Sequence, residues 1–134
     1  MKIFKVLPLL LCFMLLSCDD VFECMIGRNP SLPNKQFPIG TTEGYYYVDL
    51  SAEIKNEPRD NDYDYYFHVE GLPLGMDYFV NYRTISLEGT PEETGVFEIT
   101  IYLDVDGPFR NNFDDDPDLL CNYSTSKSYT LVIE

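Results

Sequence analysis

Short runs in which apolar and polar residues alternate constrain this chain more than any other feature of its sequence. The longest run places an apolar side chain at every second position from Phe97 to Val105, with Glu98 and Thr100 on the opposite phase. A period of two is typical of a strand with one buried face. No stretch of useful length carries a helical period, so the sequence predicts an all-β fold.

Similar runs begin at Tyr46, Tyr63 and Tyr129, and two shorter ones cover residues 76–80 and 84–87. Glycine and proline separate them, because these residues favour turns. Short alternating strands at this spacing, within about 100 residues, favour an antiparallel β-sandwich of about seven strands. We expect residues 39–134 to form this domain, with no internal repeat and no second domain.

The N-terminal residues are typical of an export signal. Lys2 and Lys5 precede an apolar run over residues 6–16, which is too short to span a bilayer as a permanent helix. The segment Leu15 to Cys18 resembles the bacterial lipobox, in which cleavage precedes a lipidated cysteine. This resemblance implies a signal peptide over residues 1–17, lipidation and a palmitate chain at Cys18, and a tether over residues 18–38. The alternative is an ordinary secretory signal in which Cys18 is incidental.

A lipid at Cys18 would hold the chain to a membrane of the bacterial cell envelope. Asp19 and Asp20 follow this cysteine directly. Acidic residues there resemble a retention signal for the inner membrane in enteric bacteria, and a surface-export signal in the Bacteroidetes. We favour the outer membrane or the cell surface, and the sequence leaves the inner membrane open.

Two cysteines remain for the folded domain, because Cys12 is lost with the signal peptide and Cys18 is consumed by lipid. Cys24 and Cys121 lie near the two ends of the domain. In an oxidising compartment such a pair favours a disulfide over a metal or catalytic site. The alternative is two buried free thiols.

Two turn motifs carry a family resemblance. Residues 71–76 read GLPLGM, and residues 87–91 read LEGTP, followed by GVFEI over residues 95–99. This order resembles the Ig-like domain family of bacterial surface proteins, which is related to the cadherin-like domain of dystroglycan. The resemblance implies an antiparallel Ig-like or cadherin-like sandwich, in which we expect Leu72 and Met76 to close one end. The family usually has glycine where Ile85 stands, which leaves the turn over residues 81–84 undefined.

The charge balance excludes one class of partner and suggests one cofactor. The chain has 9 Lys and Arg against 23 Asp and Glu, a net charge of -14 that repels nucleic acid. Carboxylates on a loop are ligands that Ca²⁺ prefers. The candidate calcium ligands are Asp104, Asp106, Asp114, Asp115 and Asp116. The alternative is a solvated acidic loop, since the segment lacks the spacing of an EF-hand.

Three of the eleven tyrosines fall on the polar phase of their strands and are candidates for a ligand platform: Tyr45, Tyr47 and Tyr66. A tyrosine offers a rigid ring with a polar tip, which suits a protein or glycan partner. The absence of Trp weakens the glycan interpretation. The alternative is that these rings simply cover the outer face of a sheet.

Catalytic motifs are missing from the sequence. The single histidine, His68, lies within an alternating run, and the chain has no nucleophile elbow, phosphate-binding loop or Cys/His metal cluster. We therefore expect a non-catalytic, membrane-anchored lipoprotein that presents an interaction domain to an envelope protein or glycan, without a cofactor unless calcium binds. The alternatives are a structural or accessory envelope subunit without its own ligand, and a calcium-binding cadherin-like module.

Overall fold

The computed structural model describes residues 27–107 and 120–134. Within them the chain forms strands joined by turns, plus one 3₁₀ turn, η2, at Asp60–Asp62. No helix in these two ranges is long and apolar enough to cross a membrane. The strands are β1 (Pro30–Ser31), β2 (Tyr46–Ser51), β3 (Glu53–Ile54), β4 (Asp64–Glu70), β5 (Met76–Asn81), β6 (Thr84–Gly89), β7 (Gly95–Asp106) and β8 (Ser124–Ile133).

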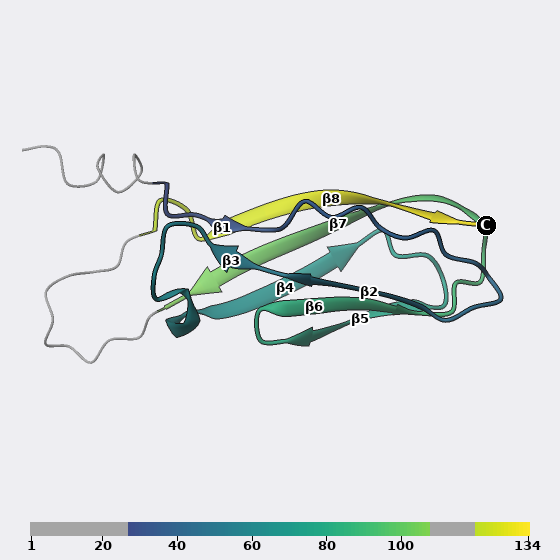
Figure 1. Ribbon diagram of the computed structural model, residues 1–134, viewed down its shortest axis with the longest axis horizontal. Helices are drawn as coiled ribbons and strands as arrows, with labels where there is room; N and C mark the ends of the chain where they lie inside the picture. The colour runs from purple at the N-terminus through teal and green to yellow at the C-terminus, as the bar shows by residue number, and fades with distance from the viewer. Residues whose placement is uncertain (1–26, 108–119) are drawn as a thin grey trace, which may run out of the picture.

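Two antiparallel three-stranded sheets face each other in Figure 1. One has the order β2-β6-β5 and the other has the order β4-β7-β8. The short strand β3 follows β2 after Ala52 and pairs with β1. In the immunoglobulin fold the second, fifth and fourth strands form one sheet, and the third, sixth and seventh form the other. With β2 and β3 counted as one strand, this chain has that order, which confirms the expected Ig-like sandwich.

The segment before β2 contacts both sheets. It pairs with β3 through β1, and further on Gly40 forms a parallel bridge with Ile133 of β8. Leu32 and Phe37 from this segment are buried in the core. The folded domain therefore begins earlier than the expected boundary at residue 39, since part of the expected tether packs between the sheets. Its two apolar side chains are too few to show a strand period, so sequence reasoning missed them.

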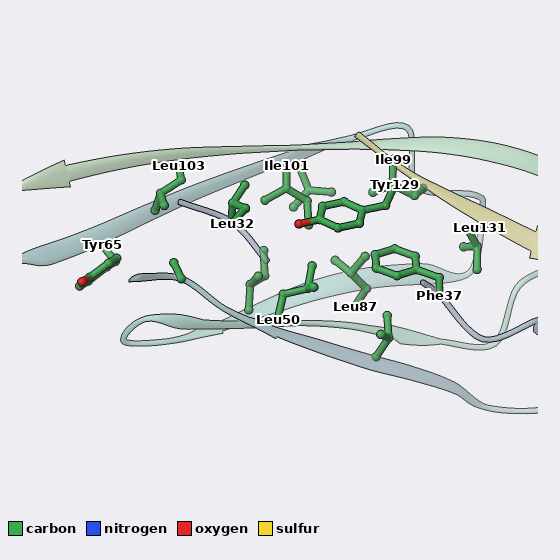
Figure 2. Packing of buried hydrophobic residues seen from close by; sticks show 14 of the residues in the cluster. Leu32, Phe37, Leu50, Tyr65, Leu87, Ile99, Ile101, Leu103, Tyr129 and Leu131 are labelled. Atoms are coloured by element: carbon green, nitrogen blue, oxygen red, sulfur yellow. The ribbon is translucent and has the colours of Figure 1, made fainter. Parts of the chain in front are cut away.

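The alternating runs supply the core, as expected. In β7 the side chains from Ile99 to Val105 on the apolar phase are buried, and β8 contributes Tyr129, Leu131 and Ile133. From the opposite sheet, Leu50 and Leu87 pack against them (Figure 2). Since the two inner faces hold the buried residues of both sheets, the hydrophobic core stabilises the sandwich as a single unit.

The two turn motifs pack against each other at the end of the sandwich that also holds the C-terminus (Figure 1). The amide of Glu92 donates to the carbonyl oxygen of Leu74 at 2.9 Å, which joins the two turns directly. Pro91 is fully buried there. Leu72 and Met76 are partly buried against the core, in agreement with the expectation that they close this end.

The turn that the motif left undefined is a tight hairpin. Asn81 pairs with Thr84, so only Tyr82 and Arg83 connect β5 to β6. Ile85, which departs from the turn motif that the sequence resembles, is completely buried and pairs with Leu50 of β2. An isoleucine is therefore used here as a core residue, and the departure from the motif leaves the strand intact.

Candidate functional site

The three tyrosines of the expected ligand platform lie on two different sheets. Tyr47 belongs to β2 and Tyr45 directly precedes that strand, and both project outward with more than half of their surface exposed. Tyr66 is equally exposed but lies on β4, in the opposite sheet. The structure therefore brings Tyr45 and Tyr47 together, and it separates Tyr66 from them.

Tyr45 and Tyr47 lie next to the carboxylate of Glu88 and next to a groove in the surface. Tyr47 pairs in register with Glu88 of β6. Slight desolvation, a hydrogen bond to Glu88 and the charge of that carboxylate raise the pKa of Tyr45. Next to the two rings is a groove of about 250 Å³, lined by residues 38–41 and 44–47. This arrangement forms an outward aromatic surface with a shallow recess at its edge.

Tyr66 has different surroundings on the outer face of the other sheet. It pairs in register with Asp104 of β7, and the neighbouring pair is His68 and Tyr102. The rings of His68 and Tyr102 lie 5.9 Å apart, and the Tyr102 hydroxyl donates to Glu70 at 3.2 Å. The carboxylate of Glu70 raises the pKa of Tyr102. The aromatic rings beside Tyr66 are therefore engaged with neighbours on their own sheet.

Only two of the candidate calcium ligands fall on described residues. Asp104 and Asp106 are exposed near the end of β7, and Asp106 accepts a hydrogen bond from the amide of Gly107 at 2.9 Å. Asp114, Asp115 and Asp116 lie outside the described residues. Residues 27–107 and 120–134 contain no group of three or more metal-ligating side chains that could hold an ion. Calcium binding stays a prediction.

Of the predicted cysteine sites, only Cys121 is described, and Cys18 and Cys24 lie outside the described residues. The amide of Cys121 donates to the carbonyl oxygen of Arg28 at 3.0 Å. Arg28 is four residues from Cys24 in the sequence. The lipidation of Cys18 and the pairing of Cys24 with Cys121 stay predictions.

Sequence reasoning missed a cation cluster at the tip of the β5–β6 hairpin. Arg83 binds Asp60 through two hydrogen bonds of 2.9 and 3.1 Å, and this pairing raises the pKa of the guanidinium. The same guanidinium lies 5.3 Å from the ring centre of Tyr65 and 5.6 Å from that of Tyr82. Asp60 belongs to η2, which precedes β4, and Tyr65 belongs to β4 itself. The cluster therefore connects the β5–β6 hairpin of one sheet to the start of β4 in the other sheet. Its parts are far apart in the sequence, so no local pattern could reveal it.

A second feature that sequence reasoning missed is a larger groove along the edge of β8. It has a volume of about 490 Å³ and lies between residues 34–37 and residues 127–130. Below it the rings of Phe37 and Tyr129 stack at 4.8 Å, and both rings are buried (Figure 2). The alternation of β8 predicts the position of Tyr129, but nothing in the sequence indicates that residues 34–37 lie beside it.

The sheet order and the contact between Gly40 and Ile133 define the chain as an Ig-like β-sandwich protein. No family model matches the chain, and no curated protein matches it. Among solved structures it is similar to domain M7 of titin, with 12% identity and a TM-score of 0.46. That match covers 80% of this chain and 95% of the titin domain.

Proposed function

We propose that this protein is a membrane-anchored bacterial lipoprotein that presents a non-catalytic Ig-like interaction domain at the cell envelope, in the manner of the bacterial surface family that its turn motifs resemble. The lipid on Cys18 attaches the chain, and the sandwich binds a protein or a glycan. The outer membrane or the cell surface is the favoured location. The observation that carries the interaction role is the outward projection of Tyr45 and Tyr47 beside the 250 Å³ groove.

The tyrosine surface supports this role because exposed aromatic rings are costly to leave in water and are common at binding surfaces. Tyr45 and Tyr47 come from consecutive outward positions, and Ile39, which also lines the groove, is exposed beside them. A partner that covers these three side chains would bury apolar area without rearranging the core.

A disulfide between Cys24 and Cys121 is part of the same proposal. The hydrogen bond from Cys121 to Arg28 supports it, because Arg28 is only four residues from Cys24 in the sequence and four residues of chain reach at most about 14 Å. In the chain-entropy model a bond that closes so long a loop contributes about 4 kcal/mol. Mass measurement of alkylated protein under non-reducing conditions should show Cys24 and Cys121 protected from the reagent.

The anchor is tested by detergent phase separation of cells that express the full chain. The wild-type protein should enter the detergent phase, and Cys18→Ala should move it to the aqueous phase or leave an unprocessed precursor. Cys12→Ala is the matched control, because it removes a cysteine from the signal peptide without removing the lipid site. Processing and partitioning of Cys18→Ala like the wild type would contradict the lipoprotein assignment.

The interaction role is tested by placing a photo-crosslinking amino acid at position 47 in intact cells. We expect a reproducible crosslinked species that disappears when Tyr45 is also changed to Ser. The matched control carries the crosslinker at position 102, on the outer face of the opposite sheet. A glycan array probed with the purified full chain covers the carbohydrate alternative. An absence of both a crosslinked species and a bound glycan would favour a structural subunit without its own ligand.

A further inference from the structure

The groove along β8 differs in charge from the rest of this acidic chain. The whole chain carries a net charge of -14, yet the groove is lined by two lysines and by no carboxylate. Its lining residues are Asn34, Lys35, Gln36, Phe37, Lys127, Ser128, Tyr129 and Thr130. A recess of about 490 Å³ with this composition offers hydrogen-bond donors and positive charge in a chain whose net charge is strongly negative.

The two lysines of the groove are held in different ways. Lys35 lies 2.9 Å from a carboxylate oxygen of Asp49, so its charge is neutralised. The ammonium of Lys127 instead donates to the carbonyl oxygen of Leu32 at 3.2 Å and to the amide oxygen of Asn34. Both acceptors are neutral, and within the described ranges no carboxylate forms an ion pair with Lys127. The Lys127 ammonium is thus fixed in position and keeps an uncompensated positive charge.

The backbone of β8 is also open inside the groove. The amide of Gly40 donates a hydrogen bond to the carbonyl oxygen of Val132, and the amide of Glu134 donates one to the carbonyl oxygen of Gly40, each at 2.9 Å. Backbone groups of alternate residues face the same edge of a strand, so Ser128 and Thr130 face this edge as well. In the part of the chain that the structure describes, no backbone hydrogen bond reaches Ser128 or Thr130 from this side.

The segment over residues 33–40 runs beside this open stretch of β8 and contacts the strand at Tyr129 and at Ile133. The Tyr129 hydroxyl donates to the carbonyl oxygen of Pro33 at 2.8 Å, and Phe37 stacks on the Tyr129 ring. Gly40 then pairs with β8 beyond the groove. Residues 34–36 therefore form one wall of the groove. On the other side, the backbone groups of Ser128 and Thr130 form a short strand edge without a backbone partner among the described residues.

We propose that this groove binds an extended peptide segment that carries a carboxylate. The peptide adds to β8 by hydrogen bonds to the backbone of Ser128 and Thr130, and its carboxylate binds the ammonium of Lys127. An acidic sugar would satisfy Lys127, but Phe37 and Tyr129 are buried and offer no exposed ring for a sugar to stack on. The free strand edge therefore favours a peptide. This site is separate from the tyrosine surface, so its test does not depend on that surface.

The proposal is tested by fluorescence anisotropy with the full chain in detergent micelles. The probe is a labelled, end-blocked heptapeptide of alternating Thr and Val with one central Glu, and its twin carries Gln in place of Glu. We expect the Glu peptide to bind about tenfold more tightly, because a charge-assisted hydrogen bond is about twice as strong as a neutral one. Equal affinities of the two peptides, or no binding of either, would overturn the proposal.

Two variants locate the binding site. Lys127→Gln should remove the difference between the Glu and Gln peptides, whereas Lys55→Gln removes an exposed lysine outside the groove and should preserve it. Thr130→Pro deletes an amide that faces the groove and should weaken both peptides. Ser124→Pro is its control, because this position starts β8 outside the groove. An undiminished preference for the Glu peptide in Lys127→Gln would refute the site.

Two further measurements keep the test decisive if Thr130→Pro does not fold. A Glu peptide whose amide nitrogens are all methylated should bind at least about tenfold more weakly than the unmethylated peptide, since it cannot donate hydrogen bonds to the carbonyl oxygens of β8 with either of its edges. Equal binding of the methylated and unmethylated peptides would reject strand addition. Oligogalacturonate serves as the acidic sugar, and its binding in the absence of any peptide binding would identify a saccharide site instead.

Discussion

Gly75 and Gly89 approach so closely that a Cβ atom on Gly89 would lie 2.3 Å from the carbonyl oxygen of Gly75. Gly75 has a φ of 86°, and a Cβ added there would lie 2.1 Å from the carbonyl oxygen of Thr90. The two turns thus exclude side chains at both positions. The motifs that resemble one family in the sequence are, in three dimensions, one packed unit at the end of the sandwich.

Replacing Gly89 by Ala should therefore destabilise the domain. The added Cβ forces the backbone of one turn away from the other, and we expect a loss of at least about 2 kcal/mol in the free energy of unfolding. Gly44→Ala is the matched control, because its Cβ would meet only the side-chain oxygen of Thr41 at 3.1 Å. Urea denaturation of both variants measures the difference. Equal midpoints would show that the turns are not packed as described.

Replacing Phe37 by Ala tests whether the segment before β2 belongs to the fold. Phe37 is 7% exposed and stacks on Tyr129, so its removal should cost about 3–5 kcal/mol. Ile39→Ala, two residues away at a side chain that is 62% exposed, should change stability by less than about 0.5 kcal/mol. Thermal unfolding of the two variants decides the matter. Equal effects of the two substitutions would favour the expected tether over residues 18–38.

The strands were predictable because each alternating run is long enough to show its period. Ile99, Leu103 and Leu131 are buried as their phase requires, and the register between β7 and β8 pairs Ile99 with Tyr129 and Phe97 with Leu131, which keeps the apolar phases of both strands on one face. The segment over residues 30–37 gave no such signal. Its place is set by contacts with β3 and Tyr129, which are distant in the sequence and become visible only when the sheets are assembled.

The candidate sites, like the strands, could be predicted from the sequence only where a local pattern indicates them. The outward direction of Tyr45, Tyr47 and Tyr66 follows from strand phase, but phase does not tell which sheet a strand joins. Sequence reasoning therefore grouped three side chains that belong to two surfaces. The β8 groove depends on the path of residues 34–37 and on the partners of Lys127, neither of which has a local pattern.

The pair of Arg83 and Asp60 should be energetically coupled. Both side chains are about one-fifth exposed, so solvent screens the pair only in part. A double-mutant cycle with Arg83→Gln and Asp60→Asn should give a coupling free energy of about 1 kcal/mol. Arg83→Lys should not restore stability, because lysine cannot form the two parallel hydrogen bonds. The exposed pair of His68 and Glu70 is the control, and a coupling there as large as that of Arg83 would argue against a structural role of the cluster.

Stability should fall steeply in alkaline solution because three tyrosines are buried with their hydroxyls bonded to carbonyl oxygens. Burial raises the pKa of Tyr46, Tyr65 and Tyr129 from 10.0 to about 12. Their hydroxyls donate to Pro38, Asp60 and Pro33 at 3.0, 2.8 and 2.8 Å. A group with a raised pKa in the folded state contributes fully below the unfolded value, and this contribution is lost as the pH rises through the folded value.

We therefore expect the free energy of unfolding to decline between about pH 10 and pH 12. Urea denaturation at half-unit steps of pH measures the slope. Tyr129→Phe should flatten the decline, since it removes one of the three buried hydroxyls, whereas Tyr66→Phe alters an exposed ring and should leave the slope unchanged. A decline that is identical in both variants and the wild type would show that the ionisation of Tyr129 does not limit the alkaline stability of the sandwich.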